Sequence, residues 1–474
     1  MVISDDVYEL KILVKVLLGK IAALELTILK LETENTSLRA ENAELKSRLN
    51  LDSHNSSKPP STDGLRKKPA FPREKGGQQG GQENHHGKTL EMVKNPDQII
   101  VCKPERCDCG RDLSQEPTTI LSHRQEFDLP KPRLEVIEYQ LAQIVCPGCG
   151  QKHKGCYPKW INAPVQYGNS VKALAVLLNN DYKLPFKKIQ SLFDDIYGYS
   201  INESTIISAN QSCYENLAQT ETAIQNSIIA SAAVNSDESG IRCNGKLHWL
   251  HVASTAMYTY LFVHKNRGKE AIESDKSILM RLFGWSIHDC WSSYFNLNHL
   301  KHGVCGAHLL RELQALVENS SLWAKDFQNF LLKTYKTPIQ DRMTNQQKIE
   351  FEFDTIIKQA QIEEPMPERT GKKGKLKRTK GRNLLERLQK HKQAVLAFAF
   401  NAEVPFTNNQ AERDIRPVKV KMKVSGCFRT FTGAEYYARI ASFISTTRKN
   451  QLNVFKELSN AFNGYTFLTI TQPK

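Results

Sequence analysis

The sequence predicts a protein of the α/β (α+β) class, in which a sheet-containing core follows a coiled coil and a cysteine-rich module. Three observations support this prediction. Leucines recur every seven residues near the N-terminus, cysteine pairs lie between 102 and 149, and strand-like segments appear from 230 onwards. At 474 residues the chain is too long for one ordinary core and should form roughly three domains.

The composition favours a polyanionic partner, nucleic acid first and an acidic membrane second. The chain has 65 Lys and Arg against 50 Asp and Glu, a net charge of +15. Its N-terminus carries two acids where a secretory signal has basic residues. The longest apolar stretch, 12–29, contains Lys15, Lys20 and Glu25, which argues against a membrane span. With eleven cysteines, typical of a reducing compartment, the sequence predicts a cytoplasmic protein.

The heptad repeat predicts a parallel homodimeric coiled coil over residues 1–50. With Leu at positions 10, 17, 24, 31, 38 and 45 as d, the a positions are mostly Val and Ile, followed by Asn35 and Asn42. This pattern favours two parallel strands with a defined register. The alternative is one long amphipathic helix packed on its own protein. Residues 51–95 are rich in Pro, Gly and polar side chains and are predicted to be a flexible linker.

Residues 96–160 predict a zinc ribbon, with a β-rich stretch at 133–145. In CPGCG, two cysteines two residues apart precede a glycine, which is the tight knuckle that tetrahedral Zn²⁺ needs. The earlier pair is less regular, with one intervening residue. Free buried thiols are the alternative. The candidate ligands are Cys107, Cys109, Cys146 and Cys149, with Cys102 as a possible substitute.

Residues 161–228 predict a helical DNA-binding segment. Three short helices are expected, at 168–181, 187–198 and 202–217. The lysines at 183, 187 and 188 are expected at the surface, as in a helix-turn-helix reader of DNA. A plain helical spacer fits these residues equally well.

Residues 229–320 predict the first part of a sheet core. ASAAVNSDESG predicts a strand that stops at Asp237, Asn244-Gly245 a hairpin turn, and YTYLFVHKN a third strand. A helix-like stretch at 269–284 leads to a short strand ending at Asp289, and HGVCGAHLLRELQALV reads as a strand entering a helix. Three antiparallel strands, a crossover helix and another strand are the order of a ribonuclease-H-like sheet.

Three carboxylates are expected to meet in such a sheet. Its first and fourth strands are neighbours, so Asp237 and Asp289 would project from adjacent strand ends. Close carboxylates repel each other unless cations neutralise them, and hard oxygen ligands suit Mg²⁺. Glu412, in TNNQAERDIRP, would complete a two-metal site for in-line attack on a phosphodiester. Asn409-x-x-Glu412 also fits a capping box, and the capping and ligand roles are compatible.

Longer blocks around these acids resemble the insertion sequence 66 family of bacterial transposases. The blocks are HNSSKPPSTDG, the cysteine pairs, SDESGIRCNGKLHWLHVA, HDCWSSYF, CGAHLLREL and TNNQAERDIRPVKVKMKVSGCFRTFTGA. The resemblance implies a DDE transposase with Asp237, Asp289 and Glu412 as catalytic ligands of Mg²⁺ or Mn²⁺.

The resemblance also implies a function: cleavage of DNA at the ends of the protein's own insertion element and strand transfer into target DNA. The partners it implies are those two DNAs and possible accessory proteins of the same element. It further implies association with a bacterial nucleoid. A non-catalytic DNA-binding regulator derived from a transposase is the alternative.

Residues near the three acids are expected to have other roles. Glu238 and His288 each adjoin an aspartate, so strand pleating should point them to the opposite face. Asp414 lies about 200° around a helix from Glu412 and is expected to pair with surface arginines. Cys305-x-x-His308 cannot hold zinc alone, so a role in starting a helix is favoured over metal binding.

A basic segment predicts where DNA would bind. Residues 369–382 hold eight basic residues and no acid, inside a helical and basic insertion at 321–395. The second part of the core, 396–455, precedes a C-terminal tail at 456–474. Pro417 is expected to break the helix between Glu412 and Lys419. The candidate DNA-binding residues are Lys372, Lys373, Lys375, Lys377, Arg378, Lys380, Arg413, Arg416 and Lys419.

Overall fold

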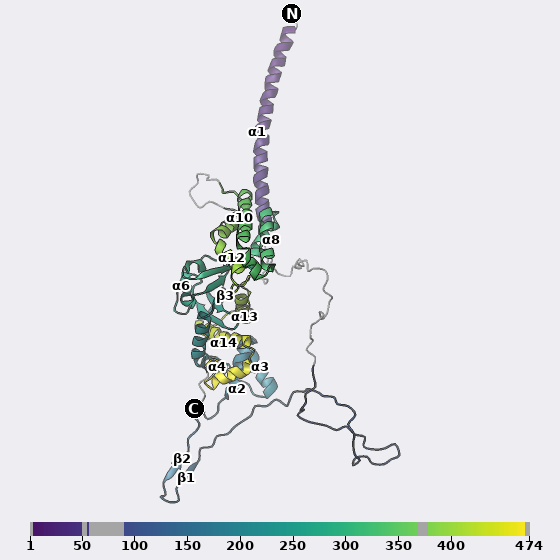
Figure 1. The fold of residues 1–474 in the computed structure, drawn as a ribbon, viewed down its shortest axis with the longest axis vertical. Helices are drawn as coiled ribbons and strands as arrows, with labels where there is room; N and C mark the ends of the chain where they lie inside the picture. The colour runs from purple at the N-terminus through teal and green to yellow at the C-terminus, as the bar shows by residue number, and fades with distance from the viewer. Residues whose placement is uncertain (1–2, 50–54, 56–89, 368–377, 470–474) are drawn as a thin grey trace. The chain divides into compact units, whose positions relative to one another are not determined.

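The computed structural model describes residues 3–49, 55, 90–367 and 378–469 (Figure 1). The chain divides into two compact units, of which the smaller comprises Leu65–Lys159 and Leu192–Ser200. Most of the predicted linker lies outside the described residues, as do four candidate DNA-binding residues: Lys372, Lys373, Lys375 and Lys377. Within the described ranges, no helix is both long and apolar enough to cross a membrane.

The N-terminal repeat forms one uninterrupted helix, α1 (Ile3–Leu49). The leucines of the repeat whose side chains are described are all exposed: Leu10, Leu17, Leu24, Leu31 and Leu38. An exposed apolar stripe along a helix is the surface that a coiled-coil partner would cover. Pairing through this stripe stays a prediction.

The cysteine-rich unit contains one antiparallel hairpin, made by β1 (Gln143–Val145) and β2 (Lys152–Lys154). The β-rich stretch expected at 133–145 is therefore a strand only over its last three residues. Both strands are exposed, so no core packs against them and β-propensity alone does not extend them.

The next segment is helical, as predicted, with one helix more than expected. It contains α2 (Asn169–Asn180), α3 (Phe186–Tyr197), α4 (Glu203–Asn216) and α5 (Ala218–Ile229). The side chain of Asn202 caps α4 by accepting a hydrogen bond from the Ser204 N–H. Lys187 and Lys188 are exposed, but the surface position expected for Lys183 is wrong. Lys183 is buried, because its ammonium donates to the Asn180 carbonyl at the end of α2.

The core is a five-stranded mixed sheet. Its strands are β3 (Ala233–Cys243), β4 (Lys246–Ser254), β5 (Thr259–His264), β6 (Trp285–His288) and β7 (Lys301–Val304), in the order β5-β4-β3-β6-β7. The first three are antiparallel neighbours, while β6 and β7 run parallel to β3. Asn244 and Gly245 have φ of 48° and 73°, which confirms the predicted hairpin turn.

Helices cover both faces of this sheet. On one face α5 packs Ile224 and Ile228 against Val234 and Phe262. On the other lie α13 (Asn409–Ser425) and α14 (Phe431–Lys449). This mixed α/β architecture is consistent with a ribonuclease-H-like core. The helix expected at 269–284 is reduced to α6 (Lys269–Ile272) and the short 3-10 turn η2 (Leu279–Arg281).

Helices fill the chain between β7 and α13: the first is the helix predicted to follow that strand, and the others form the predicted insertion at 321–395 and its continuation. They are α7 (Gly306–Val317), α8 (Leu322–Lys336), α9 (Ile339–Thr344), α10 (Gln346–Glu363), α11 (Lys380–Lys390) and α12 (Lys392–Phe400). Most of them share one core with Ile287 of β6 and Val304 of β7. The predicted tail at 456–474 instead contains most of α15 (Val454–Phe462), whose Leu458 and Ala461 are buried in a core shared with α2 and α4.

Candidate active site

Asp237 and Asp289 lie at equivalent positions on adjacent parallel strands. The last paired residues of β3 and β6 are Asn235 and Ile287, and each aspartate comes two residues later. Because side chains alternate along a strand, both aspartates lie on the same side as those partners. Asp289 directly follows β6, as predicted. Asp237 does not end its strand, because β3 continues to Cys243 through its pairing with β4.

Glu412 lies in the first turn of α13, on the face of the sheet where Asp237 lies. Residues of β3 at odd positions, such as Ile241, pack against Ala411 and Ile415 of this helix. The negative charges of Asp289 and Glu412 both raise the pKa of Asp237, so the three carboxylates are within electrostatic reach. The structure thus places Asp289 and Glu412 close enough to Asp237 to act on its charge, just past the residues that pair β3 with β6, and their joint binding of a metal stays a prediction.

Asp237 is held largely in its protonated form at neutral pH. Burial raises its pKa most, and with the charges of Glu238, Asp289 and Glu412 the value rises to about 8. One backbone hydrogen bond, from the Glu238 N–H at 2.9 Å, opposes this rise. Nearby, the buried Oε1 atom of Glu412 has no hydrogen-bond partner. Buried carboxylates that repel one another, one of them with an oxygen that has no hydrogen-bond donor, fit a divalent cation such as Mg²⁺ or Mn²⁺.

The raised pKa of Asp237 predicts how pH affects stability without metal. The folded state holds this proton to about pH 8, whereas the unfolded chain loses it near 3.8. Stability should therefore fall as pH rises through this window, by up to about 1.4 kcal/mol per pH unit. We expect urea unfolding in EDTA to show this loss for the wild type and not for Asp237→Asn. Parallel profiles for the two proteins would contradict the assignment.

Glu238 and His288 lie on the opposite face of the sheet, as strand pleating predicts. Glu238 accepts hydrogen bonds from the Tyr294 hydroxyl at 2.5 Å and from Arg267 Nε at 2.8 Å. His288 stacks on Tyr294 and lies 3.0 Å, Nε2 to Nδ1, from His302. Burial lowers the pKa of His288 to about 3, so this histidine is neutral.

Asn408, and not Asn409 as the capping-box pattern suggested, is the N-cap residue of α13. Its side chain makes no capping hydrogen bond. Its Nδ2 donates to the Ser236 carbonyl at 2.7 Å, its Oδ1 accepts from Asn235 Nδ2 at 2.8 Å, and its backbone N–H donates to Cys305 Sγ at 3.1 Å. One buried asparagine thus ties the helix of Glu412 to β3 beside Asp237 and to the end of β7.

Replacing Asn408 with alanine should slow cleavage more than it weakens binding. The change leaves buried partners on β3 unpaired, at a cost of about 1–3 kcal/mol of stability. It also frees the start of α13 to shift, and such misplacement costs roughly 10²-fold in rate. Single-turnover cleavage and DNA binding would be compared with those of Asn409→Ala, an exposed neighbour. Equal cleavage by the two variants would show that Asn408 does not position the site.

Gly306 allows the start of α7 to touch the segment before α13. Its N–H donates to the Phe406 carbonyl at 2.8 Å. A Cβ at this position would lie 2.3 Å from the Phe406 ring, a distance that a side chain cannot adopt. This close approach brings the first turn of α7 beside Glu412.

Basic side chains surround Glu412. Arg416 Nη2 lies 3.2 Å from Oε2, and Arg311 Nη2 lies 3.6 Å from Oε1. Lys419 donates to the Gly240 carbonyl at 3.2 Å, three residues beyond Asp237 on β3. Arg311 is a further basic residue of this site, and no local pattern in the sequence marks it.

The helix break expected at Pro417 is wrong, because α13 continues through it and two turns place Glu412 and Lys419 on one face.

The other described candidates for DNA binding lie at the surface or form ion pairs. Arg413 donates to Gln410 at 2.9 Å, Arg378 pairs with Glu386, and Lys380 is exposed at the start of α11.

The pairing expected for Asp414 is wrong, because its partner is not a surface arginine. Asp414 accepts a hydrogen bond from Lys449 Nζ at 2.6 Å, and Ser254 and Thr259 donate to the same oxygen. The side chains of Asp414 and Lys449 are only 9% and 11% exposed. This buried pair joins α13 to α14 and the sheet.

The cysteine knuckles are formed, but the two pairs are separate. The Gly110 and Gly150 N–H groups each close a turn, onto Cys107 and Cys146. In the described part of the chain, no three of the candidate thiols come within 4.8 Å of one another. Cys102, Cys109 and Cys149 are free and exposed. A zinc site built from the two pairs stays a prediction.

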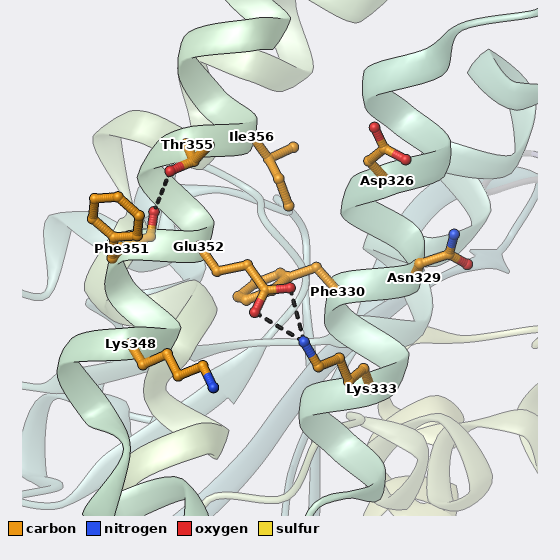
Figure 2. Close-up of a pocket in the computed structure, with 9 residues that line it drawn as sticks. All are labelled: Asp326, Asn329, Phe330, Lys333, Lys348, Phe351, Glu352, Thr355 and Ile356. Atoms are coloured by element: carbon orange, nitrogen blue, oxygen red, sulfur yellow. Dashed lines mark hydrogen bonds and ion pairs between the residues drawn. The ribbon is translucent and has the colours of Figure 1, made fainter.

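A surface groove lies between α8 and α10, and none of the predicted site residues lines it (Figure 2). The two helices are joined across it by Lys333, which donates to both oxygens of Glu352 at 3.1 Å. The groove therefore belongs to the insertion and not to the carboxylate site.

A mixed sheet of this order, with acidic residues just past the residues that pair its parallel strands β3 and β6, is consistent with the core of the DDE class of polynucleotidyl transferases. A family model described as Transposase IS66 family matches residues 164–436, which is more than half of the chain. The chain belongs to this family of transposases. A second model, described as a family of unknown function, matches residues 6–91. No curated protein matches the sequence.

Proposed function

We propose that this protein cleaves DNA at the ends of its own insertion element and transfers the freed 3′-hydroxyl into target DNA. The observation that supports the proposal is that the charges of Asp289 and Glu412 both act on the buried Asp237, in a chain of the IS66 family. Asp237 lies on β3 and Asp289 directly after the adjacent parallel strand β6, and Glu412 comes from α13, which packs on β3.

These three carboxylates would hold Mg²⁺ or Mn²⁺, which when bound polarises the scissile phosphate and activates the attacking oxygen. In the first reaction, water replaces the 3′ oxygen at the phosphorus, so that the element ends in a 3′-hydroxyl and the flank in a 5′-phosphate. In the second, that hydroxyl oxygen bonds to a target phosphorus and the target's 3′ oxygen leaves with a proton.

The chain's own cations support DNA binding at this site. Arg311 and Arg416 pair with Glu412, and Lys419 lies beside β3. Once the carboxylates are neutralised, the two guanidinium groups are free to bind phosphate oxygens. Lys419 would contact the phosphate backbone along the same face of α13.

The remaining modules would assemble two DNA ends. Pairing of α1 into a parallel dimer would bring two subunits together, so that both ends of the element are processed in one complex. The cysteine knuckles, loaded with Zn²⁺, and the helices from α2 to α5 would hold the end sequence. The exposed lysines at 187 and 188 are the basic side chains of this segment that suit phosphate contacts.

Cleavage of the gene's own flanking DNA tests the proposal. The purified full chain would be incubated with DNA that spans both flanks, with Mg²⁺, Mn²⁺ or EDTA, and the 3′-ends mapped at nucleotide resolution. We expect metal-dependent nicks at paired flanking sites and none in a shuffled DNA of equal length. Tight binding without any cleavage would instead favour a non-catalytic regulator.

A further inference from the structure

Three different metal-ligating side chains meet where α7 begins beside α13. A ligand atom of each of Cys305, His308 and Glu412 lies within 4.8 Å of the others. His308 Nδ1 lies 3.8 Å from Glu412 Oε1, and neither buried atom has a hydrogen-bond partner. Sequence spacing supplied only the cysteine and the histidine, since the glutamate comes from 104 residues further along the chain.

This donor set is that of a transition metal and not of Mg²⁺. A thiolate, an imidazole nitrogen and a carboxylate oxygen are the usual ligands of Zn²⁺, whereas Mg²⁺ takes oxygen ligands. Cys305 Sγ already accepts a hydrogen bond from the Asn408 backbone N–H, and a donor of this kind stabilises the negative charge of a metal-bound thiolate. His308 Nδ1 and Glu412 Oε1, which are buried without a hydrogen-bond partner, would each gain a bond to the metal.

Two features oppose metal binding here and set its strength. Arg311 and Arg416 pair with Glu412 and would have to release it. Burial also raises the pKa of the Cys305 thiol, so metal must displace a proton. The site should therefore bind Zn²⁺ more weakly than a closed structural site with four ligands.

We propose that Cys305, His308 and Glu412 form a Zn²⁺ site with an open fourth position, distinct from the Mg²⁺ site of the three carboxylates. The two sites share Glu412, so they cannot both be filled with this carboxylate as a ligand. Zn²⁺ bound here withdraws Glu412 from Asp237 and Asp289 and blocks cleavage. The binding site stands independently of the proposed function, whereas the inhibition depends on it.

Metal counting tests the site without requiring any DNA cleavage. The full chain would be equilibrated with buffered Zn²⁺, dialysed, and its bound zinc measured per chain by mass spectrometry. Zinc held at the cysteine knuckles is common to all variants and cancels. We expect Cys305→Ala and His308→Gln each to bind one equivalent less than the wild type. Cys213→Ala, which alters an equally buried cysteine on α4, should bind the wild-type amount.

Two outcomes would overturn the proposal. One is an equal zinc count in all four proteins. The other is found by replacing zinc with Co²⁺ and comparing the thiolate-to-metal absorption of the wild type and Cys305→Ala. Equal absorption in the two proteins would place the metal elsewhere. His308→Gln serves as the second variant should Cys305→Ala fail to fold, because His308 is less buried than Cys305.

Inhibition is measured separately. In Mg²⁺-dependent cleavage we expect the Zn²⁺ concentration for half inhibition to rise at least about tenfold in Cys305→Ala, or 1.4 kcal/mol. If Cys305→Ala binds one zinc equivalent less but is inhibited at the same Zn²⁺ concentration as the wild type, the zinc site is supported and the proposed inhibition is wrong. A wild type that binds zinc but never cleaves DNA would contradict the proposed function alone.

Discussion

A Glu412→Gln protein is expected to bind element-end DNA and to leave it uncut. The amide keeps the size of the side chain and its place in the first turn of α13, but removes the charge that a divalent cation requires. Cleavage should fall by at least about 10³-fold, equivalent to about 4 kcal/mol of barrier. Binding should persist, since the loss of one negative charge beside Arg311 and Arg416 favours phosphate contacts.

The matched control is Glu352→Gln, which removes a carboxylate of an exposed ion pair in the insertion. Both variants would be assayed with Mg²⁺ and with Mn²⁺, and DNA binding measured in parallel at one salt concentration. Cleavage by Glu412→Gln at the rate of the control would exclude Glu412 from the catalytic carboxylates and leave it as a partner of nearby arginines.

Removing the Lys449 ammonium should destabilise the core strongly. Lys449→Met leaves the Asp414 carboxylate buried without its cationic partner, and breaking a buried ion pair in this way costs about 3–5 kcal/mol. Asp414→Asn should cost a similar amount, because Lys449 then loses its counterion. The double variant should recover part of the loss. Urea unfolding followed by circular dichroism would give the four free energies of a double-mutant cycle.

Lys333→Met is the comparison for this cycle. Lys333 is 67% exposed and pairs with Glu352 on the surface of the insertion, so its loss should cost no more than about 1 kcal/mol. Equal destabilisation by Lys449→Met and Lys333→Met would show that burial does not set the strength of the Asp414 pair.

The parts of the site that rest on local chemistry could be predicted from the sequence. Asn244-Gly245 determines a turn by its own backbone preferences, and Asp289 follows a short apolar run that was expected to be a strand and is one. The helix after TNNQ is likewise a local signal. The pairing of β3 with β6 could be predicted from the order of strands and helices along the chain, because the first and fourth strands of a ribonuclease-H-like sheet are neighbours.

The parts that rest on distant contacts could not be predicted. Asn408 bonds to Ser236, 172 residues away, and no local pattern marks that pair. Asn409 was the expected cap because spacing alone cannot say which of two adjacent asparagines faces the sheet. Pro417 was expected to end a helix, but burial of Ile415 and Val418 against the sheet outweighs the local cost of proline.

The attachment of α13 along its length bears on the conformational entropy that the candidate active site would lose on binding DNA. Asn408 holds its start, Asp414 its second turn, Lys419 bonds to β3, and Lys421 donates to the Asn179 carbonyl at 3.1 Å. The backbone beneath Glu412 is therefore preorganised, and little of it needs ordering when substrate arrives. The ordering cost falls on the flexible arginines at 311 and 416. Changes in those side chains should alter affinity for DNA, whereas changes in the attachments of α13 should alter turnover.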